Sequence, residues 1–117
     1  MSIIRIISKK ILRPEFSRVS FIEYTNELSE NAKSQEGFIK SNSYWKTSLE
    51  SSNKIIFEKA ERLTIISISE WNELSDWDKW FRSELRNNIH LKYKKIIEDE
   101  QFSLLKKKVV NEDVFLL

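Results

Sequence analysis

The segment LTIISISEWNELSDWDKWF, residues 63–81, changes its hydrophobic period at Trp71. The residues before this tryptophan are rich in isoleucine, which favours a strand with at least one buried face. After it, Leu74, Trp77 and Phe81 follow at spacings of three and four, and acidic residues typical of a helix start lie between them. We therefore predict a strand that leads directly into a short helix.

The amino-terminal part of the chain predicts a strand, a helix and a second strand. Residues 3–12 (IIRIISKKIL) are rich in β-branched isoleucine, which suits a strand. A helix is expected over about residues 15–34, with Pro14 in its first turn, where the missing N–H of proline costs nothing. Gly37, the only glycine, is expected to adopt a left-handed conformation before a strand over residues 38–45.

The carboxyl-terminal part completes the predicted order of elements. The segment SLESSN, residues 48–53, predicts a turn, and an apolar stripe predicts a second helix over about residues 84–98. The tail VVNEDVFLL, residues 109–117, predicts a final strand. The order strand, helix, strands, helices, strand indicates one α+β domain over residues 1–117, with a mainly antiparallel sheet covered on one face.

The first predicted helix has two apolar sides. One side carries four residues at helical spacing and is expected to pack on the sheet: Phe21, Tyr24, Leu28 and Ala32. The other side carries Phe16, Val19 and Ile22. A second apolar side indicates contact with a further surface, such as another subunit, or a first turn that tucks under a loop.

Composition excludes several classes of function. The 117 residues contain no cysteine and one histidine, which excludes disulfides, thiolate chemistry and a multi-histidine metal site. A net charge of +2 from 20 basic and 18 acidic residues, mixed along the sequence, offers no strong general attraction to nucleic acid, and basic and aromatic residues interleave without a one-sided basic face. The amino terminus lacks the features of a signal peptide, and no apolar run approaches the roughly 20 residues that span a bilayer. We expect a soluble cytoplasmic protein.

The strand and aromatic helix resemble a known family. Pro14 before a long helix, Gly37 with Phe38, and the run from LTIISISEW into WNELSDWDKWFRSE are similar to the antibiotic biosynthesis monooxygenase domain, over about residues 3–100. That family has a ferredoxin-like fold in the dimeric α/β barrel superfamily. The resemblance implies a homodimer whose sheets pack face to face and a pocket for a small hydrophobic aromatic molecule between sheet and helices. For the longer segment 46–61 the sequence leaves three interpretations open: an extended hairpin, a lid or a dimer arm.

One branch of the superfamily suggests heme chemistry. The staphylococcal-type heme-degrading monooxygenases use a proximal histidine and a tryptophan ten residues before it, and Trp80 and His90 have this spacing. The resemblance implies that His90 binds heme iron and that the bulk of Trp80 distorts the porphyrin. Those enzymes also have an asparagine on the first strand, where the nearest polar residue here is Ser8. The alternative for His90 is a half-exposed helix residue without a chemical role.

A second hypothesis is oxygenation of an aromatic, quinol-like substrate without a cofactor. It needs a hydrophobic pocket and polar groups that stabilise an ionised substrate. Asn42, Tyr44, Trp71 and Arg86 are the candidate ligand-binding residues. Strand alternation leaves open whether Asn42 and Tyr44, or their neighbours Ser43 and Trp45, face the pocket.

The aromatic helix is expected to divide its side chains between core and pocket. Trp77 and Phe81 are expected in the core with Trp71, because each can bury a large area. Trp80 lies off their face and is the pocket candidate. The third hypothesis for the whole protein is a ligand-binding or dimerisation module without catalysis.

Overall fold

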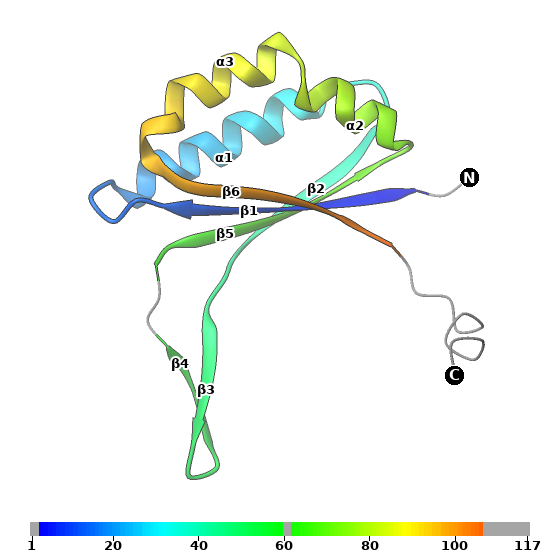
Figure 1. Cartoon of the computed structure of the whole chain (residues 1–117). Helices are drawn as coiled ribbons and strands as arrows, with labels where there is room; N and C mark the ends of the chain where they lie inside the picture. Colours follow the sequence, from blue (N-terminus) through cyan, green and yellow to red (C-terminus); the bar gives the residue numbers. More distant parts are fainter. Residues whose placement is uncertain (1–2, 60–61, 107–117) are drawn as a thin grey trace, which may run out of the picture.

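The computed structural model describes residues 3–59 and 62–106. Within these residues the elements are β1 (Ile4–Leu12), α1 (Arg18–Ala32), β2 (Phe38–Trp45), β3 (Ser48–Ser52), β4 (Ile55–Lys59), β5 (Thr64–Trp71), α2 (Leu74–Phe81), α3 (Glu84–Tyr93), a 3₁₀ turn (Lys94–Ile96) and β6 (Ile97–Leu105). The helices lie together over one face of the main sheet and leave its other face uncovered (Figure 1). No helix in the described residues is long and apolar enough to cross a membrane.

The main sheet has the strand order β2-β5-β1-β6, and every neighbouring pair is antiparallel. With the β3–β4 hairpin set aside, the chain runs strand, helix, strand, strand, helices, strand, and its first and third main strands occupy the centre of the sheet. This is the ferredoxin-like arrangement. The predicted α+β class, with an antiparallel sheet covered on one face, is confirmed.

The central strand β1 has polar residues on its buried face. Ile6, Ser8, Lys10 and Leu12 alternate with half-buried or exposed neighbours and are all buried beneath the helices. A strand sends successive side chains to opposite faces, so Ser8 and Lys10 share the inner face with the apolar core. The inner face of the sheet is therefore not purely hydrophobic.

Helix α1 packs as its sequence predicts but begins later. Phe21, Tyr24 and Ala32 are buried, and Leu28 is partly buried against the same core. The prediction that Pro14 lies in the first helical turn is wrong. Pro14 lies in the turn before the helix. The helix begins only after Ser17, whose side chain caps it by accepting the backbone N–H of Ser20.

Gly37 adopts the predicted left-handed conformation, with φ +81°. A Cβ at this position would lie 2.1 Å from Oδ2 of Asp76 in α2, a separation that no side chain tolerates without movement. The backbone carbonyl of Gly37 also accepts the N–H of Asn72 at 2.8 Å. This glycine therefore lets the loop before β2 approach the start of α2 closely.

The prediction of a turn over residues 48–53 is wrong, because most of this segment forms β3. It pairs with β4, and the turn lies at Asn53 and Lys54, which both have positive φ. Positive φ at both residues suits a two-residue hairpin turn, and asparagine tolerates this backbone conformation. The segment 46–61 thus contains an extended hairpin that points away from the helices (Figure 1).

The helix predicted over about residues 84–98 is also too long. It ends at Tyr93, and a 3₁₀ turn leads into β6, which begins at Ile97. The EDEQ run at residues 98–101 has poor strand propensity, so local sequence did not indicate a strand. Pairing with β1 overrides that propensity. The strand predicted over residues 109–117 lies outside the described residues.

The aromatic residues of α2 divide differently from the prediction. Trp71 is 1% exposed, as expected for a core residue, but Trp80 is the buried member of α2 at 7% exposed. Trp77 and Phe81 are partly buried, and their rings stack with centres 4.9 Å apart. Both rings also contact Phe102 of β6. The three rings form a layer over one end of the sheet.

Candidate functional site

A cavity of about 70 Å³ lies between the inner face of the sheet and the helices. The sheet contributes a polar floor, which consists of Ser8, Lys10, Ser41, Ser67 and Ser69. Half of the remaining lining residues are aromatic, namely Phe38, Trp71, Trp77, Trp80, Phe81 and Phe102. Such a combination of apolar walls and a few polar groups is typical of small-molecule sites.

The junction of α2 and α3 positions two of the lining residues. Ser83 caps α3, and its side chain accepts the backbone N–H of Arg86 at 3.1 Å. The same hydroxyl donates to the carbonyl of Trp80 at 2.7 Å. One serine therefore fixes the start of the helix that carries Arg86 and the end of the helix that carries Trp80.

Arg86 has its positive charge balanced within the protein. Its Nη2 donates to Oε1 of Glu100 at 2.6 Å, and both side chains are about 10% exposed. The guanidinium carbon also lies 4.5 Å from the centre of the Phe81 ring. A short contact between buried opposite charges, with an aromatic ring alongside, holds the side chain in one orientation.

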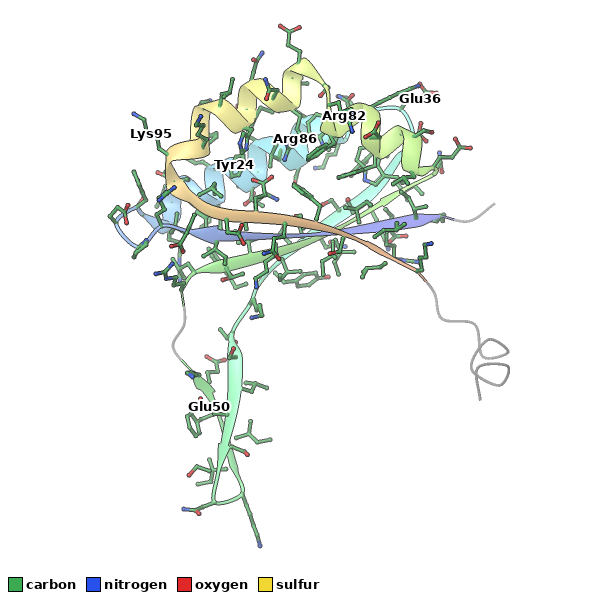
Figure 2. The ribbon with its side chains drawn as sticks, viewed as in Figure 1. Tyr24, Glu36, Glu50, Arg82, Arg86 and Lys95 are labelled. Atoms are coloured by element: carbon green, nitrogen blue, oxygen red, sulfur yellow. The ribbon has the colours of Figure 1, made fainter. Side chains whose placement is uncertain are left out.

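Glu100 uses its second oxygen to accept a hydrogen bond from Tyr24. The Tyr24 hydroxyl donates to Oε2 at 3.0 Å and lies 3.2 Å from Nδ1 of His90. Because the hydroxyl has a single hydrogen, Nδ1 of His90 must be the donor in the second contact. Burial, followed by the charge of Glu100, raises the pKa of Tyr24. Figure 2 shows Tyr24 and Arg86 between the helices and the sheet.

Lys10 differs from Arg86 in having little to neutralise it. It is 4% exposed, and its Nζ donates to Oγ of Ser8 at 3.0 Å. Glu100 is its cross-strand neighbour, yet within the described part of the chain Lys10 has no ion pair within 4.0 Å. Burial lowers the pKa of Lys10 to about 8, although the charge of Glu100 acts in the opposite direction.

The structure brings three of the six predicted site residues to the cavity, namely Trp71, Trp80 and Arg86. His90 does not line it, and its side chain is 33% exposed. Hydrogen bonds through Tyr24 and Glu100 connect it to the lining residue Arg86. Asn42 and Tyr44 alternate with Ser41 and Ser43, and only Ser41 of these four lines the cavity. Asn42 and Tyr44 therefore lie on the uncovered face of the sheet.

Two charged residues of the site were absent from the predicted set. Lys10 shares its strand face with Ile6, Ser8 and Leu12, so the period of two could have identified it as an inward-facing cation. Glu100 had no comparable signal, because its strand was not predicted. Among the residues that the structure describes, no group of three or more potential ligands could hold a metal ion.

No protein-family profile and no curated protein matches this chain in sequence. Solved structures do match. A variant of SnoaB, a cofactor-independent oxygenase of Streptomyces nogalater, superimposes with a TM-score of 0.70 at 6% identity, over 94% of this chain and 97% of that chain. A conserved protein of Methanosarcina mazei Go1 has a TM-score of 0.62 at 21% identity, over 92% and 95% respectively.

A structure described as an antibiotic biosynthesis monooxygenase has a TM-score of 0.63 at 14% identity, over 91% of this chain and 99% of that chain. These likenesses extend over almost the whole length of every chain compared. At such low identity they concern the fold and not the chemistry. The chain has the ferredoxin-like fold of the antibiotic biosynthesis monooxygenases.

Proposed function

We propose that this protein is a small oxygenase of the antibiotic biosynthesis monooxygenase type, which acts on a hydrophobic aromatic compound without a bound cofactor. The observation that carries the proposal is the cavity between sheet and helices, where Trp71 and Trp80 form aromatic walls above a polar floor. The similarity in fold to a cofactor-independent oxygenase supports the same reaction class by analogy.

The chemistry needs an electron-rich substrate that ionises. A ring methylene or C–H carbon beside a phenol becomes a carbonyl, one atom of O₂ enters the product, and the other leaves as water. The substrate supplies the electrons, so the reaction requires no reductant. The protein's contribution is to hold the ionised substrate, stabilise its negative charge and exclude water.

The volume of the cavity limits how the substrate binds. A cavity of about 70 Å³ is smaller than the roughly 150 Å³ site in which benzene binds in an engineered protein. An aromatic ring therefore enters only if lining side chains move. The partly buried members of the aromatic wall are Phe38, Trp77, Phe81 and Phe102, so we expect displacement among these four side chains.

Oxygen consumption tests this proposal. Purified protein is mixed with a panel of hydroquinones and anthrones, and oxygen uptake is followed beside product formation. We expect at least one compound to consume about one O₂ per product, and Trp80→Ala to reduce the rate because it removes an aromatic wall. Lys79→Met, at an exposed position of α2, is the control and should retain the wild-type rate. Inactivity across the panel would support the binding-module alternative.

A heme site formed by Trp80 and His90 is the second candidate, and the geometry supports it less. Trp80 lines the cavity but His90 does not, and Nδ1 of His90 is engaged with Tyr24. A porphyrin is much larger than benzene, so a cavity of about 70 Å³ does not fit it. We predict that hemin titration gives the same absorbance change with His90→Ala as with wild type. Saturable one-per-chain binding that the substitution abolishes would restore the heme hypothesis.

We also propose that two copies associate through the uncovered face of the sheet. This face carries an apolar patch on the two central strands, formed by Ile7, Ile11, Ile66 and Ile68, with Tyr44 on the edge strand β2. Lys9 lies on the same face, between Ile7 and Ile11. At its edge, Glu70 forms ion pairs with Arg5 at 3.5 Å and Lys40 at 3.3 Å. An apolar centre with a charged rim is the composition expected of a protein interface.

The β3–β4 hairpin supports association with a second copy. Its large apolar side chains are exposed, namely Leu49, Ile55, Ile56 and Phe57. An isolated two-stranded hairpin is only marginally stable in water, so a partner surface would stabilise it. The hairpin extends from the sheet on the side away from the helices (Figure 1). Figure 2 labels Glu50 of β3 on this hairpin.

Sedimentation at micromolar concentration tests the dimer. We expect wild type to sediment as a dimer and Ile68→Glu to sediment as a folded monomer, because the substitution places a charge at the centre of the apolar face. Val19→Glu introduces the same charge at an exposed position of α1 and should remain dimeric. A monomeric wild type contradicts the proposal, and dissociation by Val19→Glu alone would place the interface on α1.

A further inference from the structure

The polar floor of the cavity carries an excess positive charge. Lys10 from β1 and Arg86 from α3 both line the cavity, and Glu100 from β6 lies beside Arg86 without lining it. Glu100 pairs closely with Arg86 at 2.6 Å and also accepts a hydrogen bond from Tyr24. One carboxylate therefore offsets one of two cations, and the ammonium of Lys10 is left without a close counter-charge in the described part of the chain.

The ammonium of Lys10 also uses only part of its hydrogen-bonding capacity. An ammonium has three donors, and within the described residues Lys10 uses one of them, toward Ser8. A charged group with unused donors is costly to bury unless a partner satisfies it. Both Lys10 and Ser8 line the cavity, so a ligand there can supply that partner. An anionic oxygen provides the opposite charge and accepts hydrogen bonds from both side chains.

We propose that Lys10, with Ser8 beside it, binds the ionised oxygen of an acidic phenol or enol. This assignment rests on the proposed ligand cavity and names the class of compound that enters it. The walls Trp71 and Trp80 suit the ring of such a compound. The small volume favours a single ring whose ionised edge reaches Lys10, in preference to a fused polycyclic compound.

The charge on Lys10 determines how binding depends on pH. Binding requires an ionised phenol and a protonated Lys10, and an adjacent cation lowers the pKa of the bound phenol. Glu100, Arg86 and, more distantly, Tyr24 are the other titratable groups around the site. Because burial holds the pKa of Lys10 at about 8 in the free protein, affinity should fall as the pH rises above that value.

Absorbance of 4-nitrophenol tests the assignment, because its neutral and ionised forms differ in colour. The pH is set below the pKa of the free phenol, so that the probe in solution is mostly neutral. We expect saturable binding that produces the colour of the phenolate. Lys10→Met and Lys10→Gln should weaken binding by more than about tenfold and abolish the colour change, because a charge-assisted hydrogen bond is lost. Lys79→Met should bind as wild type does.

Two results would overturn the assignment. One is the absence of saturable binding by wild type, and the other is a phenolate signal in folded Lys10→Met equal to that of Lys79→Met. Oxygen uptake measured on the same samples separates this inference from the proposed reaction. Phenolate bound through Lys10, with no oxygen uptake for any compound of the panel, refutes the oxygenase and leaves the binding site intact. Full oxygen-uptake activity of Lys10→Met would refute the role of Lys10 and leave the proposed oxygenase intact.

Discussion

Replacement of Lys10 by methionine should stabilise the protein at neutral pH. Burial lowers the pKa of Lys10 from 10.5 to about 8. At about 1.36 kcal/mol per pKa unit, the charged form costs about 3 kcal/mol in the folded state. Methionine removes that cost at similar volume but also loses the hydrogen bond to Ser8, worth about 1 kcal/mol. The net gain in the free energy of unfolding should be about 2 kcal/mol.

The gain should disappear as the pH rises. Between about pH 8 and 10.5 the unfolded chain still holds the proton of Lys10, whereas the folded chain releases it. Since the unfolded state then binds more protons, the stability of wild type increases with pH across this window. The variant lacks this titration. The difference between the two proteins should therefore be largest below pH 8 and smallest near the upper end of the window.

Urea unfolding at several pH values across this range measures the difference. Lys79→Met is the matched control, because an exposed helix position should change stability by less than about 0.5 kcal/mol and without a pH trend. Lower stability of Lys10→Met than wild type at neutral pH would refute the reasoning. So would a gain that is constant with pH, since it would originate from packing instead of charge.

Three further substitutions test the contacts around the site by the same unfolding assay. Gly37→Ala should cost at least about 1 to 2 kcal/mol, because φ is +81° and the new Cβ meets Asp76. Arg86→Met should cost about 3 kcal/mol or more, because Glu100 loses its buried partner, and double substitution with Glu100→Gln should recover part of that loss. Tyr24→Phe should cost about 1 kcal/mol. A loss below about 0.5 kcal/mol would contradict each expectation.

Much of the fold follows from local sequence periodicity. The strand ending at Trp71 and the inward face of α1 have patterns that match their structures, and the change of period at Trp71 correctly predicts where α2 follows. Strand β6 lacks such a pattern, because acidic and amide residues occupy its first half. Its pairing with β1 comes from the tertiary fold, which a local pattern cannot represent. Because this strand was not predicted, Glu100 was not predicted as a residue of the site.

Burial within α2 was harder to predict because a short helix has few residues to define its inner side. The spacing of Leu74, Trp77 and Phe81 suggested one face, but Leu74 is 48% exposed and Trp80 is buried. The direction in which a helix packs depends on what lies beside it. Here the rings of Trp77 and Phe81 both contact Phe102 of β6, so contacts between distant segments set the boundary of the site.

Stability and ligand binding at Lys10 should be thermodynamically linked. An anionic ligand that pairs with the ammonium favours its protonated form, and it offsets the charge that destabilises the free protein. Nitrophenol at about 100 times its dissociation constant should add about 2.7 kcal/mol to the unfolding free energy of wild type. Lys10→Met should show much less stabilisation at the same concentration, although it is the more stable free protein. Equal stabilisation of both would mean that the ligand binds elsewhere, and Lys10 would then be a buried cation without a role in recognition.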